Sequence, residues 1–150
     1  MKKTYLLWYK GTDRWVDRLI RLFDGGDYSH VEIAEENSDG SWTILSASKR
    51  DNHQVRIKQL TLNPDHWDIM EVTHSLPSDP LTISLGSLGK RYDTVGAILS
   101  ITRLGRNRKD RIHCSALIGQ VLGLQDPWRL SVRELHKEVT EKFETKMKGS

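Results

Sequence analysis

The hydrophobic pattern changes its period part-way along the chain, and this change constrains the fold more than any other feature. Residues 5–72 contain short segments with apolar side chains at alternate positions, which is typical of strands that bury one face. Beyond Pro77 and Pro80, apolar residues recur at intervals of three and four, which favours helices. Strands followed by helices predict an α+β fold, with the proline-containing segment as a change of layer within one domain.

The expected elements follow from these periods and from turn and capping residues. Asn37–Gly40 indicates a hairpin turn, and Ser131–Glu134 has the pattern of a helix capping box. Strands are expected at 5–9, 28–34, 42–48, 55–60 and 67–72, and helices at 15–23, 92–101, 114–122 and 132–143. Thr12 is expected to cap the first helix, Gly25-Gly26 to end it, and residues 146–150 to fray. The expected result is a central antiparallel sheet packed against helices.

Length and composition set the class of protein. The 150 residues are enough for one domain, 1–150, with a hydrophobic core of ordinary size. Apolar runs fall far short of the ~20 residues that cross a bilayer, and the start of the chain lacks a secretory signal. We therefore expect synthesis in the cytoplasm, with a place in a virion or an infected host cell as alternatives. The net charge of +3 is too small to indicate nucleic acid as a partner.

Cys114 is the one cysteine in the chain, which excludes a disulfide within it and a cysteine-based zinc site. It lies in the first turn of an expected helix, directly after a basic segment. The unpaired N–H groups of a helix start stabilise a thiolate, and Lys109 and Arg111 are expected to add to this effect. A reactive nucleophile is one interpretation, and a small buried side chain is the other.

His30 and Glu32 form a second candidate group. They share one face of an expected strand, while Val31 and Ile33 occupy the other face. A histidine beside a carboxylate is a typical general base with the group that orients it. The alternative is a solvated face of the sheet. Because His30 is distant from Cys114 in sequence, only the fold can bring the two together.

Several segments together resemble a known superfamily. Ser29–Ile33 is similar to the histidine-bearing strand of the NlpC/P60 superfamily, Gly89–Gly96 to its tyrosine-containing segment, and Cys114–Ile118 to its helix start. The histidine precedes the cysteine here, which resembles the circularly permuted, papain-like amidase branch (YiiX/YaeF-like, akin to lecithin retinol acyltransferase). Ser46–Asp51 and Gly123–Ser131 resemble small members of this branch encoded by tailed bacteriophages.

The resemblance implies a fold and a set of roles. A central antiparallel sheet would pack against a helix that carries Cys114, the nucleophile, at its N-terminus. His30 would be the general base, and Tyr92 would line the substrate site near the oxyanion. The third group would come from the strand after the histidine, where Ser46 lies, and Ser46 is also a candidate for substrate binding. Glu32 is the preferred third group, because a carboxylate both fixes the histidine tautomer and stabilises imidazolium.

The pairing of two strands decides how these side chains meet. A hairpin that pairs His30 with Ser48 sets Glu32 opposite Ser46 on one face. A slip of one residue would place Ala47 there instead.

The expected function is that of a cysteine peptidase or amidase. The Cys114–His30 pair would cleave an amide bond through a thioacyl intermediate, without a metal or an organic cofactor. Peptidoglycan peptides are the substrate that the resemblance implies. An acyltransferase or thioesterase variant is one alternative. The other is a catalytically inactive binding module that holds an anionic polymer through the basic segment 103–111.

Overall fold

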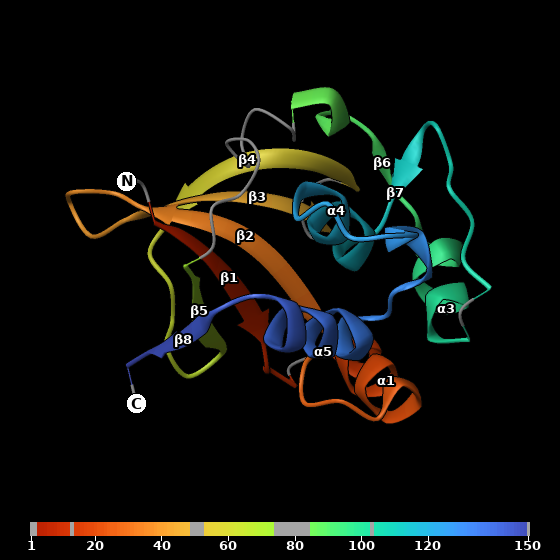
Figure 1. Cartoon of the computed structure of the whole chain (residues 1–150), viewed down its shortest axis with the longest axis horizontal. Helices are drawn as coiled ribbons and strands as arrows, with labels where there is room; N and C mark the ends of the chain where they lie inside the picture. The colour runs from red at the N-terminus through yellow and green to blue at the C-terminus, as the bar shows by residue number, and fades with distance from the viewer. Residues whose placement is uncertain (1–2, 13, 49–52, 74–84, 103, 150) are drawn as a thin grey trace.

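The computed structural model describes residues 3–12, 14–48, 53–73, 85–102 and 104–149 (Figure 1). Within this part of the chain the fold is α+β, with one eight-stranded sheet and four α-helices. The strands are β1 (Thr4–Tyr9), β2 (His30–Glu36), β3 (Trp42–Ser48), β4 (Gln54–Leu60), β5 (Trp67–Val72), β6 (Arg91–Tyr92), β7 (Arg111–Ile112) and β8 (Thr145–Lys148). The helices are α1 (Trp15–Asp24), α3 (Thr94–Ile101), α4 (Cys114–Val121) and α5 (Val132–Lys142), with 3-10 turns η1 (Leu85–Ser87) and η2 (Pro127–Arg129). Pro77 and Pro80 lie outside the described residues.

The strands follow the order β7-β6-β4-β3-β2-β1-β5-β8 across the sheet. All neighbouring pairs are antiparallel except β6 and β7, which run parallel. The expected antiparallel sheet is therefore confirmed for its five long strands. No helix among the described residues is long and apolar enough to cross a membrane.

Alternation along β1 and β2 divides the core between the two faces of the sheet. Val31 and Ile33 lie in a cluster with Leu117 of α4 and Leu135 of α5, so these two helices cover that face (Figure 1). Ala34 lies in a second cluster on the opposite face. Each fully buried aliphatic side chain stabilises the fold by roughly 1.5–3 kcal/mol, so the helix-covered face anchors α4 against the sheet.

The starts of α4 and α5 have side-chain caps. Ser131 Oγ accepts the N–H of Glu134 at 3.2 Å, and the Glu134 carboxylate accepts the N–H of Ser131 at 3.4 Å, which confirms the capping box. At α4, His113 Nδ1 accepts the N–H of Ala116 at 3.4 Å. The position of Cys114 as the first residue of α4 is therefore set by the residue before it.

Three local expectations were wrong, each because tertiary contacts decide the outcome. Helix α1 begins after Arg14 with no side-chain cap, so Thr12 does not cap it. Residues 145–148 do not fray, because they pair with β5 and form the edge strand β8. Tyr92 belongs to β6 rather than to a helix, because Asp93 caps α3 by accepting the N–H of Gly96 at 2.9 Å.

Candidate active site

Cys114 lies at the N-terminus of α4, where this helix packs against β2 and β3. Cys114 is only 4% exposed to solvent. The backbone N–H groups of Val31 and Ser115 lie close enough to Sγ to lower the pKa of the thiol by hydrogen bonding. A thiolate at this position therefore has two fixed donors, one from the helix start and one from the neighbouring strand.

His30 is the first residue of β2 and lies beside the thiol. The β2–β3 ladder runs from Glu36–Trp42 to Ile33–Leu45, so that His30 lies beyond its end, near the start of α4. The Cys114 thiol lies close enough to the imidazole to raise its pKa by charge and by hydrogen bonding. Its Nε2 lies 3.1 Å from Glu32 Oε1, which leaves Nδ1 for the sulfur. The structure thus brings together the two candidate site residues that lie farthest apart in the sequence, His30 and Cys114.

One ring contact and a hydrogen bond of the preceding residue surround His30. The Trp67 ring of β5 lies edge-on at 6.4 Å between centroids. Ser29, the preceding residue, donates from Oγ to Asp17 Oδ1 of α1 at 3.2 Å, with both residues buried. Trp42 of β3 packs edge-on against Tyr5 of β1, with 5.2 Å between the ring centroids.

Glu32 is the centre of a buried polar network. Its Oε1 accepts from three donors, which are His30 Nε2, Ser46 Oγ at 2.6 Å and Lys58 Nζ at 2.9 Å. Among the described residues its Oε2 has no hydrogen-bond partner, although it is buried. The register Ile33–Leu45 continues to Glu32 opposite Ser46, as the hairpin without a slip predicts.

The network keeps Glu32 ionised. Burial alone would raise the pKa of its carboxyl, but the hydrogen bonds and charges of His30 and Lys58 outweigh burial and lower the pKa to about 2. The negative charge is therefore present at every pH at which the protein would work. It lies on the side of the imidazole away from the sulfur.

Cys114 and His30 shift each other's titration in opposite directions. Burial would lower the pKa of His30, but the thiolate and then Glu32 outweigh it and raise the pKa to about 10. Burial would likewise raise the pKa of Cys114, yet His30 and the N–H groups of Val31 and Ser115 lower it. Both shifts favour the charged forms, so the site favours a thiolate–imidazolium pair over two neutral groups.

Tyr92 connects this pair to an open cleft. Its phenol lies close to Cys114, and burial followed by the charge of the thiolate raises its pKa well above 10.0. Tyr92 also lines a cleft of about 390 Å³ together with His53, Gln54, Arg91 and Arg111. A substrate in this cleft would contact Tyr92, whereas Cys114 and His30 are not among the residues that line it.

The structure changes the roles expected for two residues. Ser46 is fully buried behind Glu32, so it holds the carboxylate and does not reach a substrate. Arg111 lies 3.6 Å from Asp110 and faces the cleft, while the main charge that lowers the pKa of the thiol comes from His30.

Lys58 was not anticipated from the sequence. It is on β4, and its side chain reaches diagonally from a position opposite Ile44 to Glu32. The alternating pattern of β4 shows that Lys58 is a polar residue on a strand. It does not show that Lys58 reaches Glu32, because the register of β4 against β3 cannot be read from the sequence. The two donors near Cys114 are backbone N–H groups, so the residue types at these positions do not reveal them.

His113 is the other buried histidine next to Cys114. Its Nδ1 lies 3.0 Å from Ser115 Oγ, and its Nε2 lies 3.3 Å from the carbonyl oxygen of Trp128. Burial lowers its pKa below the ordinary value, so the neutral ring is favoured. Its contacts are those of a helix cap that ties α4 to the η2 turn.

Among the described residues, no group of three or more histidine, cysteine or acidic side chains is arranged to hold a metal ion. No protein-family model matches this chain, and a search of curated proteins finds no match. The functional argument therefore rests on the geometry of the site.

Proposed function

We propose that this protein is a cysteine hydrolase of the circularly permuted NlpC/P60, papain-like type, which cleaves an amide bond. One observation carries the proposal: His30 lies between the Cys114 thiol, at a helix start, and the Glu32 carboxylate, which its Nε2 contacts at 3.1 Å. Nucleophile, base and orienting carboxylate are the three roles that this chemistry requires.

In the acylation step the Cys114 thiolate attacks the carbonyl carbon of the substrate, and a carbon–sulfur bond forms. The oxyanion is met by N–H groups of the first turn of α4 and by the hydroxyl of Tyr92. When the carbon–nitrogen bond breaks, protonated His30 gives its proton to the leaving amine. The products are a thioacyl enzyme, a free amine and neutral His30.

In the deacylation step His30 takes a proton from water, and the resulting hydroxide attacks the thioester carbon. The carbon–sulfur bond breaks, the acid product leaves, and the thiolate–imidazolium pair is restored. Glu32 acts as a positioning residue throughout. Its charge stabilises the imidazolium, and its contact with Nε2 keeps Nδ1 directed at the sulfur.

The cleft beside Tyr92 suits an acidic peptide. Arg91 and Arg111 line it, and guanidinium groups bind carboxylates in a bidentate manner. Peptides with free carboxylates, such as those of peptidoglycan, have this chemistry. The same acyl enzyme would serve an acyltransferase if an alcohol or amine replaced water.

The test is the pH dependence of Cys114 alkylation by iodoacetamide, in the native protein and in His30→Ala. We expect rapid alkylation well below pH 8 in the native protein, because the thiolate is already formed. In His30→Ala the profile should move to the pH range of a free thiol. His136→Ala is the matched control, since His136 is a half-buried histidine on α5 that packs against Trp8.

A thiol that titrates like free cysteine in both proteins would contradict the proposal and favour an inactive binding module. Circular dichroism of each variant separates a loss of the pair from a loss of the fold. A positive result would be followed by hydrolysis of acidic peptides, with Cys114→Ser as the blank.

A further inference from the structure

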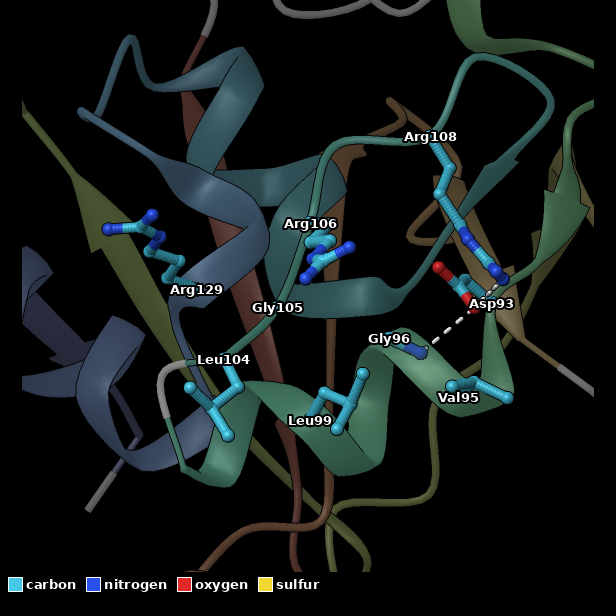
Figure 2. Close-up of a pocket in the computed structure, with 9 residues that line it drawn as sticks. All are labelled: Asp93, Val95, Gly96, Leu99, Leu104, Gly105, Arg106, Arg108 and Arg129. Carbon is cyan, nitrogen blue, oxygen red and sulfur yellow. Dashed lines mark hydrogen bonds and ion pairs between the residues drawn. The ribbon is translucent and has the colours of Figure 1, made fainter.

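A pocket of about 620 Å³ lies over α3, between this helix, the segment 104–108 and the η2 turn (Figure 2). Its lining comprises Asp93, Val95, Gly96, Leu99, Leu104, Gly105, Arg106, Arg108 and Arg129. None of the residues assigned a step in the proposed reaction lines it. It also contains part of the basic segment to which the proposed reaction gives no role.

Two glycines let the walls of this pocket approach closely. A Cβ on Gly105 would lie 2.0 Å from the carbonyl oxygen of Trp128, so the segment carrying Arg106 is pressed directly against η2. A Cβ on Gly96 would lie 2.4 Å from Asp93 Oδ2, at the first turn of α3. The close backbone contacts indicate a site that exists before any ligand binds.

The charges of the pocket are unbalanced. Arg108 reaches down to Asp93, with NH1 at 3.4 Å from Oδ1, and this is the dashed contact in Figure 2. Neither Arg106 nor Arg129 forms an ion pair within the described part of the chain. Arg106 extends over α3 between Leu104 and Arg108, whereas Arg129 comes from η2 at the other end (Figure 2). Three guanidinium groups against one carboxylate leave an excess of positive charge that a dianion would neutralise.

The floor of the pocket is apolar. Val95 and Leu104 are 52% and 66% exposed, and Leu99 is half-buried between them and the arginines. Exposed aliphatic side chains under guanidinium groups favour a ligand with both an anionic and an apolar part. We propose that this pocket binds a phosphate monoester carried on an aliphatic chain, with the phosphate at Arg106 and Arg108 and the chain over α3.

The experiment is calorimetric titration with n-octyl phosphate, kept below its micelle concentration, against inorganic phosphate and octanol. We expect octyl phosphate to bind at least about tenfold more tightly than inorganic phosphate, because only the ester buries its chain. The double variant R106Q/R108Q should weaken binding of octyl phosphate by at least about tenfold. Lys146→Gln is the matched loss of charge, on β8 at the opposite edge of the sheet from β7. It should leave binding unchanged.

Further experiments distinguish a lipid headgroup from a free phosphate ester as the ligand. They also test whether binding is independent of the proposed reaction. Cys114→Ser should bind octyl phosphate as the native protein does. Flotation with vesicles containing phosphatidic acid, lost in R106Q/R108Q, would show that a lipid headgroup reaches the same arginines. Binding to octyl phosphate without flotation would assign the pocket to a free ester.

Leu104→Ser should weaken binding of octyl phosphate and leave binding of inorganic phosphate unaffected. Equal binding of octanol and octyl phosphate, or unchanged binding in R106Q/R108Q, would overturn the proposal.

Discussion

Two polar networks lie next to Cys114, and each is built around a histidine whose side chain is largely shielded from solvent. His30 lies between a thiol and a carboxylate that is itself held by Lys58. His113 lies between a hydroxyl, a backbone carbonyl and a backbone N–H. The pKa of the first ring is raised and that of the second is lowered.

The difference shows that burial alone does not decide what a histidine does. Burial lowers the pKa of both rings, and it is the charge of the partners that reverses the direction at His30. At His113 the Trp128 carbonyl and the charge of Asp93 raise the pKa too little to offset burial, so the neutral ring is favoured. In this state Nδ1 can accept the N–H of a helix start. The same residue type thus supplies a proton carrier on one side of the thiol and a structural cap on the other.

The largest expected effect comes from giving His30 a neutral partner, as His113 has. Glu32→Gln preserves the shape of the carboxyl but removes its charge, so the pKa of His30 falls and that of Cys114 rises. We expect alkylation of Cys114 at pH 6 to slow by about tenfold to a hundredfold, which corresponds to one or two pKa units. Stopped-flow alkylation measures this rate. Glu36→Gln, at the exposed end of β2, is the control, and equal rates in both variants would remove Glu32 from the site.

The next effect is on stability and concerns His113. His113→Ala removes the cap of α4 and the contact with the Trp128 carbonyl, so we expect a loss of about 1–3 kcal/mol in the free energy of unfolding. Urea denaturation measures it. Alkylation of the folded protein at pH 6 should change by less than about threefold, since the cap carries no charge to the sulfur. A variant of unchanged stability with an unreactive thiol would instead make His113 the base.

The sequence predicts those features of the site that depend on the spacing of apolar residues within one strand or one helix. Alternation along residues 28–34 places His30 and Glu32 on one face, and helical spacing after Cys114 predicts a helix that starts there. Lys58 could not be predicted, because its reach to Glu32 depends on the register of two strands that a loop separates. The two-residue strands β6 and β7 have no period to detect, yet they place Tyr92 at the thiol.

Lys58→Met sharpens the comparison by removing one of the charges that hold Glu32. A buried carboxylate that loses a partner is costly, and we expect a loss of about 1–3 kcal/mol at pH 7. The lowered pKa of Glu32, about 2, contributes stability that is present above pH 4.5 and lost as the pH falls through about 2. In Lys58→Met the pKa of Glu32 is higher, so this loss is smaller and ends at a higher pH, while the native protein continues to lose stability. The difference from the native protein should therefore shrink between pH 7 and pH 3.

Urea denaturation across this pH range measures the effect, and Lys146→Met on β8 is the matched control. A deficit that stays constant from pH 7 to pH 3 would show that Lys58 contributes packing rather than charge. In that case Ser46 and His30 alone would hold Glu32 ionised.

The smallest effect belongs to Ser46→Ala, and it separates the position of the carboxylate from its charge. The hydroxyl donates at 2.6 Å to the oxygen that contacts His30, so its loss should cost about 1 kcal/mol in stability. Since the negative charge remains, alkylation at pH 6 should slow by less than about threefold. Ser100→Ala, at a buried serine that donates to a helix carbonyl, is the control. If Ser46→Ala slowed alkylation as much as Glu32→Gln, the orientation of the ring would govern the thiolate, and the contrast between charged and neutral partners would fail.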